Sequence, residues 1–443
     1  MINNLKYHIE TYGCQMNVYD SELISGLLIK EGGIPTKDIE TADIVFLNTC
    51  SIREKAEETV FNRLNYLKSL KKKNPKMLLG LIGCMAQNLK NDLLESNPYV
   101  DIILGPDSYR RIPDIIRSRE LSSSHNVDTR LSKYEVYEDI FPKRNSGVNA
   151  WISISRGCDK FCTFCIVPFT RGRERSKSMD SIIKEAKNAV KCGFVEITLL
   201  GQNVNSYRTS KGTFSDLLAK VANIKGVKRI RYTSPHPKDM DDELLKVMAE
   251  YDNICNYIHL PLQSGSDRIL KRMNRTYNSF DFLALVHKIR QYIPGCSIST
   301  DIIVGFPGES NDDFLQTLKI VKEVQFDSAF MFKYSPRPGT KAVEYTDQIS
   351  EELKQNRLEE LISLQRENTL KSNARKVGKY FDVLIEKESK KSSDQWAGRT
   401  DGNTWVVFDK GNESIKDIVK IYIHDAKGVT LFGRHIQNKE VVA

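Results

Sequence analysis

The sequence has 443 residues, which at roughly 100–200 residues per domain allows two to four domains, each with its own core. Apolar residues make up 40% and charged residues 28%, a composition that excludes wholesale disorder and is typical of a globular protein. The net charge of +9 favours an anionic partner such as nucleic acid without requiring one. No apolar run approaches the ~18 residues that span a bilayer, and the amino terminus has no apolar signal region, so we expect a cytoplasmic protein with no membrane contact.

The nine cysteines fall into three sets. Three stand far apart, three crowd into one short segment, and three lie in or beside apolar segments: Cys14, Cys50 and Cys84; Cys158, Cys162 and Cys165; Cys192, Cys255 and Cys296. An odd count in a reducing compartment is not typical of disulfides. The first two sets therefore indicate two separate sites, whereas the last set is expected to be structural.

The first ~110 residues alternate short apolar runs with stretches of helical period, the pattern of a βαβ fold. Predicted strands cover 6–11, 43–48 and 77–82, and predicted helices cover 18–30 and 53–71. Apolar strands separated by helices predict a small doubly wound parallel sheet.

Each of these strands runs into one of the widely spaced cysteines, Cys14, Cys50 or Cys84. Ligands of open α/β sheets collect just beyond the carboxyl ends of the strands. We therefore expect the three thiols to converge at one edge of the sheet. The alternative is a set of three unrelated buried thiols, since a free cysteine is a common core residue.

Residues 122–148 are polar and turn-rich and are expected to form a linker to a second alternating region. That region carries six predicted strands, at 151–155, 196–200, 229–234, 257–260, 297–304 and 329–332. Six β/α units favour a partial or complete barrel, and a helical pattern at 350–371 leads out of it.

The last ~65 residues carry short β-like runs at 380–385, 404–408 and 418–423 that are punctuated by glycine, a pattern that predicts a small antiparallel barrel. The predicted fold class is therefore α/β in three domains, at 4–121, 144–372 and 375–438. They are a doubly wound parallel sheet, a (β/α)6 partial barrel and a small antiparallel β-barrel.

Cys158, Cys162 and Cys165 follow the first predicted barrel strand, with three and then two residues between them. A structural zinc site usually takes four ligands, and no fourth cysteine or histidine lies nearby in the sequence. Three cysteines can hold a four-iron cluster by three corners and leave one iron open. At the carboxyl end of a barrel strand, that iron would face the usual active-site mouth. A zinc or purely structural site remains the alternative.

This CxxxCxxC spacing resembles the signature of radical S-adenosylmethionine (SAM) enzymes. The segments YGCQMN at 12–17, NTCS at 48–51 and GCMAQ at 83–87 resemble the amino-terminal domain of the methylthiotransferases within that superfamily. The carboxyl-terminal segment resembles a TRAM domain, a small RNA-binding β-barrel. The resemblance implies two [4Fe-4S] clusters, one on Cys158, Cys162 and Cys165 that cleaves SAM to a 5′-deoxyadenosyl radical, and an auxiliary one on Cys14, Cys50 and Cys84.

The segments RGCDKFCTFCIVPFTRGRER at 156–175 and LLGQNVNSY at 199–207 resemble one branch of the methylthiotransferases. That branch adds a methylthio group to C2 of N6-dimethylallyladenosine next to the tRNA anticodon, with one SAM as methyl donor and one as radical source. The clusters, rather than a protein acid or base, would carry the chemistry. An adenine C2–H offers no acidic proton and no leaving group, so a radical route is sensible. The implied partners are the prenylated tRNA anticodon stem-loop and a flavodoxin or ferredoxin, and a monomer is expected.

Residues at the ends of the predicted barrel strands are candidates for contacts with SAM. They are Gly201, Gln202, Asn203, Gln263, Ser264, Asp301 and Gly305. Asp301 and Gly305 belong to a segment that resembles the GxIxGxxE-type strand lying along the SAM adenine, with Asp301 in place of the first glycine of that pattern. Turn geometry or barrel packing is the alternative for each of these residues.

Arg171, Arg173, Arg175 and Lys177 alternate just after the cysteine loop and would share one face of an extended strand. A position beside the cluster favours contacts with RNA phosphates, and a solvated charged face is the alternative. In the carboxyl-terminal segment, Arg434 and His435 are further RNA candidates. Two rival functions stay open: the same chemistry on another substrate, and a non-catalytic RNA-binding protein with structural metal.

Overall fold

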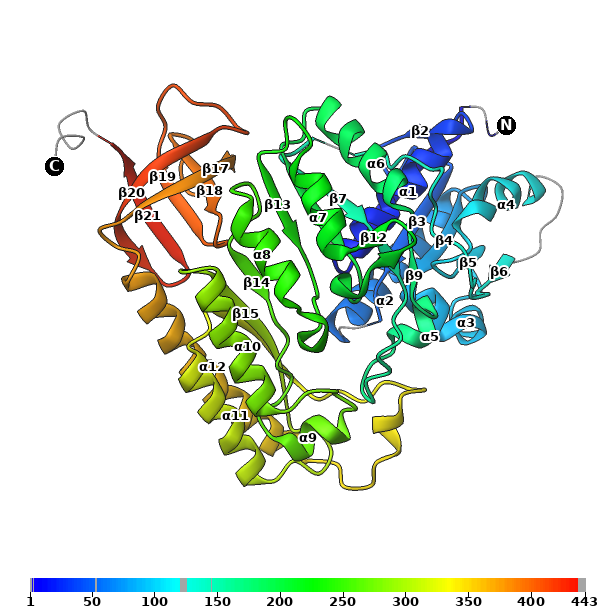
Figure 1. The fold of residues 1–443 in the computed structure, drawn as a ribbon. Helices are drawn as coiled ribbons and strands as arrows, with labels where there is room; N and C mark the ends of the chain where they lie inside the picture. Colours follow the sequence, from blue (N-terminus) through cyan, green and yellow to red (C-terminus); the bar gives the residue numbers. More distant parts are fainter. Residues whose placement is uncertain (1, 3, 52–53, 120–125, 145, 437–443) are drawn as a thin grey trace.

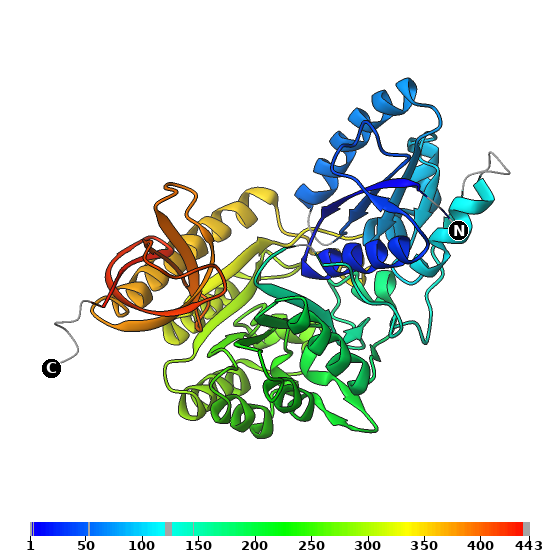
Figure 2. The ribbon, with the colours of Figure 1, turned by 90° about the horizontal axis from the view of Figure 1, so that it is seen from above.

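The computed structural model describes the chain except for residues 1, 3, 52–53, 120–125, 145 and 437–443. Three bodies follow one another along the chain: an amino-terminal α/β domain, a central open barrel and a small closed β-barrel. The central body lies between the other two in both views (Figures 1 and 2). Among the described residues, no helix is both long and apolar enough to cross a membrane.

The amino-terminal domain is a six-stranded parallel sheet in the order β2-β1-β3-β4-β5-β6. Its strands are β1 (Lys6–Tyr12), β2 (Ile34–Pro35), β3 (Ile44–Thr49), β4 (Leu78–Gly83), β5 (Ile102–Leu104) and β6 (Asn126–Asp128). Its helices are α1 (Gln15–Lys30), α2 (Glu54–Lys73), α3 (Cys84–Ser96) and α4 (Ile112–Arg119). Apolar residues of α1 and α4 cover one face of the sheet and those of α2 and α3 cover the other, so the predicted doubly wound sheet is confirmed.

The three predicted strands of this domain appear as β1, β3 and β4, each within one residue of its predicted ends. Position 53, where the second predicted helix begins, and positions 120–125, which include the domain limit at 121, lie outside the described residues. The predicted linker is wrong at its start, whereas the described residues from 129 to 148 form no helix or strand. Residues 126–128 form β6 at the sheet edge, and Tyr137 and Ile140 pack into the core beneath α1. A three-residue polar edge strand carries no periodicity that a sequence pattern can detect.

The central domain places its six principal strands in two parallel three-stranded sheets, ordered β13-β10-β7 and β14-β15-β16. They are β7 (Asn149–Ser153), β10 (Glu196–Leu200), β13 (Arg229–Tyr232), β14 (Tyr257–His259), β15 (Ser297–Val304) and β16 (Ser328–Lys333). A bridge between Ile230 and Ile254 continues the first sheet toward the second. The six predicted strands and the partial barrel are therefore confirmed.

Helices pack on the outside of this barrel through its largest apolar core. They are α6 (Met179–Lys191), α7 (Phe214–Ala222), α8 (Asp242–Glu250), α9 (Asp267–Arg272), α10 (Ser279–Tyr292) and α11 (Asn311–Val324). Short elements complete the domain: β8 (Ser155–Arg156), α5 (Val167–Arg171), β9 (Arg175–Ser176), β11 (Arg208–Thr209) and β12 (Gly212–Thr213). The long helix α12 (Glu351–Ala374) leads to the last domain, close to the predicted 350–371.

The carboxyl-terminal domain is a closed barrel in the order β17-β18-β19-β21-β20. Its strands are β17 (Tyr380–Glu388), β18 (Gln395–Thr400), β19 (Trp405–Asp409), β20 (Ile418–Lys427) and β21 (Thr430–His435). The predicted small antiparallel barrel is confirmed, although the sequence pattern found only three of its five strands. One pair, β19 with β21, is parallel. The predicted domain limit at 438 lies outside the described residues.

A buried carboxylate joins the central and carboxyl-terminal domains. Glu196 on β10 has no exposed surface, and its two oxygens bind Arg231 Nε at 3.0 Å and Arg399 Nη2 at 3.1 Å. Burial alone would raise the pKa of Glu196, but the two guanidinium groups hold it below its usual range. Arg231 also donates to the carbonyl oxygens of Thr400 and Asp401 in the small barrel. Glu196 therefore positions Arg231, which in turn binds the small barrel to the central domain.

Replacing Glu196 by alanine is expected to destabilise this junction, because it leaves the Arg231 charge buried without its partner. Removing one member of a buried ion pair typically costs about 3–5 kcal/mol. The measurement is urea unfolding followed by tryptophan fluorescence, since Trp396 and Trp405 lie in the small barrel.

Glu243→Ala is the matched control, because Glu243 pairs with Lys246 on the exposed surface of α8 and such pairs contribute little. A loss for Glu196→Ala no larger than that of Glu243→Ala would contradict the prediction.

Candidate functional site: two cysteine sites at the domain boundary

The widely spaced cysteines follow three adjacent strands that end in register. Tyr12 of β1 pairs with Thr49 of β3, and Thr49 pairs with Gly83 of β4. Cys50 and Cys84 come directly after two of these residues, and Cys14 caps the first turn of α1. The register therefore brings the three cysteines to one edge of the sheet, as the sequence predicted.

Two glycines allow this close approach. Gly83 has a φ of +95°, and a Cβ there would lie 2.7 Å from the carbonyl oxygen of Thr49. A Cβ on Gly13 would lie 2.8 Å from the Cβ of Cys50, so only a glycine lets the segment before Cys14 run beside Cys50. Asn17 also holds Cys14 in position. Its Oδ1 accepts a hydrogen bond from Cys14 Sγ at 3.3 Å, and its Nδ2 donates to Asn48 Oδ1 at 3.0 Å.

The electrostatics show that the three thiols share one environment. A hydrogen bond with Cys50 lowers the pKa of Cys14 to about 6 against the opposing effect of burial, and the nearby charge of Arg171 lowers it further. Burial raises the pKa of Cys84, and Arg171 partly offsets that rise. Arg171 belongs to the central domain, so this site is not made by the amino-terminal domain alone.

The second trio lies on a tight loop that follows β8. The N–H of Cys165 donates to the carbonyl of Cys162 at 2.9 Å, and Phe161 takes a φ of +47° to close the loop. Arg275 Nη1 donates to Cys162 Sγ at 3.3 Å. Burial, followed by the neighbouring Cys162, raises the pKa of Cys165 to about 12, and burial raises that of Cys158 to about 11.

The donor chemistry of both trios fits iron–sulfur clusters. Each set consists of thiols alone, the ligand type that such clusters prefer. Among the described residues, no three His, Cys, Asp or Glu side chains meet closely enough to hold a single metal ion. A four-iron cluster binds each thiolate to a different iron, so its ligands stand farther apart than those of one zinc ion. A buried Arg171 Nη1 without a hydrogen-bond partner in the described part of the chain also suits an anionic group beside Cys84.

The first trio borders the central barrel. Cys14 packs with Met16 and Tyr19 of α1 against Trp151 of β7 and Leu200 of β10. Both strands belong to the central barrel, and the loop that carries Cys158 follows β7 and β8 in the chain. The amino-terminal cysteine edge therefore lies against the barrel rather than facing solvent.

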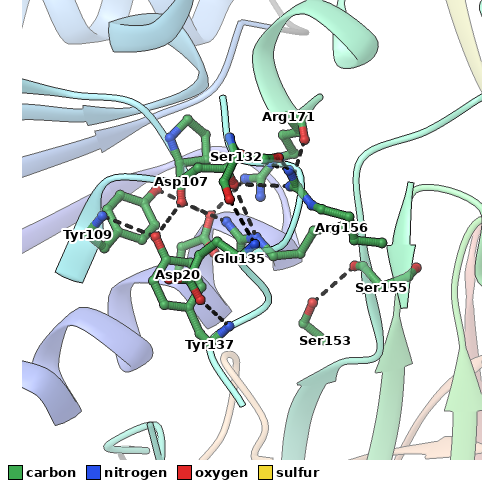
Figure 3. Close-up of polar contacts among 12 residues, drawn as sticks. Asp20, Asp107, Tyr109, Ser132, Glu135, Tyr137, Ser153, Ser155, Arg156 and Arg171 are labelled. Atoms are coloured by element: carbon green, nitrogen blue, oxygen red, sulfur yellow. Dashed lines mark hydrogen bonds and ion pairs between the residues drawn. The ribbon is translucent and has the colours of Figure 1, made fainter. Parts of the chain in front are cut away.

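A buried ion network fixes this arrangement (Figure 3). Asp20 of α1 is fully buried, and its two oxygens bind Arg156 Nη1 and Arg171 Nη2, each at 2.8 Å. Tyr109 donates to the same carboxylate at 3.4 Å, and Arg156 Nη2 donates to the carbonyl of Pro106 at 3.0 Å. Arg156 and Arg171 flank the Cys158–Cys165 loop in sequence, so one carboxylate of the amino-terminal domain anchors both ends of the loop region.

The five residues with side chains that were predicted to contact SAM divide into two groups. Three already have partners: Asn203 bonds Asp239 at 2.7 Å, Asp301 bonds His259 at 3.2 Å, and Ser264 accepts the N–H of Ser266. Gln202 and Gln263, in contrast, each bury an Oε1 atom that has no partner among the described residues.

The two predicted glycines, Gly201 and Gly305, sit where a side chain would clash. A Cβ would lie 2.6 Å from Ser155 Oγ at Gly201 and 2.3 Å from Lys354 Cγ at Gly305. Gly305 has a φ of +68°, and its N–H donates to Glu309.

Other buried polar atoms without a partner in the described chain escaped the sequence-based reasoning. They include Ser155 Oγ, His236 Nε2 and Tyr334 OH. Burial, followed by the charges of Arg275 and Lys160, lowers the pKa of His236 to about 3. No sequence pattern marks these residues, because each is a single side chain at a strand end or in a loop.

The expectation of a shared, exposed basic face is wrong for three of its four residues. Arg171, Arg175 and Lys177 are buried, where Arg175 binds Asp107 at 2.9 Å and Lys177 binds Glu185 at 2.7 Å. The chain does not stay extended: α5 ends at Arg171, Gly172 turns with a φ of +73°, and β9 is only two residues long.

Arg173 alone is exposed, with 70% of its side chain accessible, and its guanidinium lies 5.1 Å from the Phe161 ring centroid. In the small barrel, Arg434 lies 5.1 Å from the Tyr422 ring centroid and His435 binds Glu413. Cys255 and Cys296 are buried, and Cys192 is exposed.

Family models match all three bodies of the chain. Residues 6–105 match "Uncharacterized protein family UPF0004", 152–321 match the radical SAM superfamily and 374–436 match the TRAM domain. A curated tRNA-2-methylthio-N(6)-dimethylallyladenosine synthase from Parabacteroides distasonis is 46% identical over 98% of this chain and 96% of its own. Another from Porphyromonas gingivalis is 47% identical over 98% and 95%. This chain belongs to that synthase family.

Membership of the synthase family confirms the predicted resemblance, and the radical SAM domain implies a [4Fe-4S] cluster and SAM. Among solved structures, a radical SAM methyltransferase from Kitasatospora setae, with cobalamin and a [4Fe-4S] cluster bound, matches with a TM-score of 0.58 at 12% identity over 77% of each chain. A cobalamin-dependent SAM radical enzyme matches with a TM-score of 0.55 over 82% of this chain and 56% of its own. At these identities the likeness supports the fold of the synthase alone.

In the metal-free protein, Cys14 is expected to react with iodoacetamide at lower pH than Cys158 and Cys165 of the second loop, because only the thiolate reacts. A pKa of about 6 makes Cys14 mostly thiolate at neutral pH, whereas a pKa of about 11 keeps Cys158 protonated there. Peptide mapping by mass spectrometry after alkylation from about pH 5 to about pH 10 measures both profiles.

Cys165, with a pKa of about 12, is the internal comparison and should follow Cys158. Superimposed profiles of Cys14 and Cys158 would show that the lowered pKa is wrong.

Proposed function

We propose that this chain converts N6-dimethylallyladenosine next to the tRNA anticodon to its 2-methylthio derivative, using one SAM as methyl donor and one as radical source. The near full-length identity to curated synthases supports this activity. One structural observation carries it: Arg171 Nε, from just beyond the Cys158–Cys165 loop, donates to Cys84 Sγ at 3.2 Å. This contact joins the segment that follows one cysteine loop to the other cysteine site, which supports two sites that serve one substrate.

Two clusters fit the two trios. Cys158, Cys162 and Cys165 would hold the radical SAM cluster, and Cys14, Cys50 and Cys84 would hold the auxiliary cluster. When bound, these groups and SAM supply the radical that activates C2 of the adenine and the sulfur that is inserted there. The chain contributes binding and orientation, and no acid or base of the protein is needed.

Specific side chains would orient SAM and the first cluster. Arg275 places a buried positive charge beside Cys162, where it would balance the negative charge of a bound cluster. The unpartnered oxygens of Gln202 and Gln263 would accept hydrogen bonds from the methionyl ammonium group of SAM or from its ribose. Gly201, Asn203, Ser264, Asp301 and Gly305 would shape the loops and strand that surround it.

The RNA would meet the mouth of the barrel and the small β-barrel. Arg173 is an exposed cation on the rim of the cysteine loop, and the neighbouring Phe161 ring, 40% exposed, offers a face for a base. Arg434 of the small barrel is a second candidate. We propose also that the protein receives electrons from a flavodoxin or ferredoxin, since reductive cleavage of SAM requires a low-potential donor. We further propose that it acts as a monomer in the cytoplasm.

Alanine substitutions are expected to separate the two cysteine sites. Cys158→Ala should retain about half of the iron and form no 5′-deoxyadenosine, whereas Cys84→Ala should lose about half of the iron but still cleave SAM. Neither variant should methylthiolate a prenylated anticodon stem-loop. Iron and sulfide analysis after anaerobic reconstitution, with chromatography of the nucleosides and 5′-deoxyadenosine, measures these outcomes.

Cys192→Ala is the matched control, because Cys192 is exposed and belongs to neither trio. A wild-type protein that binds only zinc would favour the non-catalytic rival. A loaded, SAM-cleaving protein that leaves prenylated adenosine unchanged would favour another substrate.

Arg173→Gln is expected to weaken binding of the anticodon stem-loop and to reduce the slope of log K against log[salt] by about 1, because one phosphate contact is lost. Fluorescence anisotropy at several salt concentrations measures both effects. Lys187→Gln is the control, since Lys187 is exposed on α6 at the outer surface of the barrel. Equal effects of the two substitutions would argue against a specific contact at Arg173.

A further inference from the structure

The side chain of Arg171 belongs to one domain but lies in the cysteine site of another. Arg171 ends α5 of the central domain, and α5 packs beside α3, whose first residue is Cys84. Its Nε donates to Cys84 Sγ at 3.2 Å and its Nη2 binds Asp20 at 2.8 Å. The side chain is only 4% exposed, so these contacts are not exchanged with water.

The third nitrogen of this guanidinium has no partner among the described residues. Arg171 Nη1 is buried and makes no hydrogen bond to any described residue. A buried N–H donor without an acceptor is unfavourable, and such groups usually face a ligand or water. Nη1 lies on the edge of the guanidinium opposite to the Nε–H, so its acceptor would be a group other than Cys84.

The charges around Arg171 do not balance. Three buried guanidinium groups, those of Arg156, Arg171 and Arg175, share two buried carboxylates, Asp20 and Asp107. A neighbouring cluster contains two cations, Arg144 and Lys177, and two carboxyl groups, Glu22 and Glu185. Buried charges are normally paired, and the excess positive charge of the Arg171 group lies against the thiols of Cys84 and Cys14, where thiolates or a thiolate-bound cluster would balance it.

A four-iron cluster on three thiolates carries a net negative charge in both of its common redox states. It would therefore supply negative charge beside Arg171, where Nε already contacts Cys84. We propose that Arg171 is a positioning residue of the auxiliary cluster, which donates to Cys84 Sγ through Nε and holds its buried positive charge beside the bound cluster. This inference rests on the proposed function, which assigns that cluster to Cys14, Cys50 and Cys84.

Two consequences follow from a cation that is supplied across the domain boundary. The environment of the auxiliary cluster is complete only when the domains are docked. A positive charge and an N–H donor beside the sulfurs also favour the more negative, reduced state and so raise the reduction potential of the cluster. Removal of Arg171 should lower that potential.

The experiment uses the full chain carrying Cys158→Ala, Cys162→Ala and Cys165→Ala, so that only the auxiliary site binds iron. Arg171→Gln, Arg171→Lys, Asp20→Asn and Arg173→Gln are each added to this parent. After anaerobic reconstitution, iron and sulfide are counted and the midpoint potential is measured by redox titration with electron paramagnetic resonance.

Arg171→Gln is expected to change the reduced-to-oxidised ratio at fixed potential at least tenfold toward oxidised, about 59 mV for one electron. Arg171→Lys, which keeps the charge but not the planar fork, should shift less, and the exposed Arg173→Gln should not shift. A loaded Arg171→Gln variant with the potential of the parent would overturn the inference.

Asp20→Asn separates the cluster contact from domain docking, because it removes the shared ion pair and leaves Arg171 beside Cys84. If Arg171→Gln binds no iron while Asp20→Asn is fully loaded, the direct role of Arg171 is supported. Equal loss of iron in both variants would overturn it, since docking alone would then explain the effect. A parent that binds no iron would overturn the two-cluster proposal itself. That result differs from an iron-loaded Arg171→Gln variant with the potential of the parent, which would overturn only the role of Arg171.

Discussion

The position of the two cysteine sites depends on the buried carboxylate of Asp20. It lies on α1, whose first turn is capped by Cys14, and it binds the two arginines that flank the other cysteine loop. A buried ion pair adds little net stability, because desolvation offsets the attraction between the charges. Its effect is selective: a docking that separated Asp20 from Arg156 and Arg171 would leave three charges buried without partners. The ion network therefore selects one relative placement of the two domains.

A second polar contact on α1 fixes the orientation of the helix. Tyr19 lies near Glu185, and Glu22 faces Arg144, which also binds Glu185. Burial, against the opposing charge of Arg144, raises the pKa of Glu22 to about 7. A single anchor at Asp20 would allow the helix to swing, whereas anchors on both sides of that residue do not. Since Cys14 caps the first turn of this helix, the same contacts also restrain the position of Cys14.

The sequence predicted most of the fold because strands and helices of this length have clear periodicity. It predicted the convergence of Cys14, Cys50 and Cys84 for a topological reason, since parallel neighbouring strands end at one edge. It failed for Arg171, Arg175 and Lys177, whose alternation resembles a solvated strand face. Their burial depends on Asp20, Asp107 and Glu185, and no local pattern reveals that two of these carboxylates would arrive from another domain. Unpartnered atoms such as Ser155 Oγ and His236 Nε2 are equally hidden, because an empty hydrogen-bonding position is a property of three-dimensional packing.

The choice of arginine at position 171 follows from the geometry it must satisfy. Its planar fork directs Nε and Nη2 to two different acceptors, Cys84 Sγ and the Asp20 carboxylate, and leaves Nη1 directed elsewhere. A lysine ammonium is a single point charge at the end of a flexible chain, so it cannot hold a fixed angle between a carboxylate and a thiol. Arg171 can therefore bind the two domains together and also contact a thiol of the amino-terminal site. The docking of the central domain and the electrostatics of the amino-terminal cysteine site thus depend on the same residue.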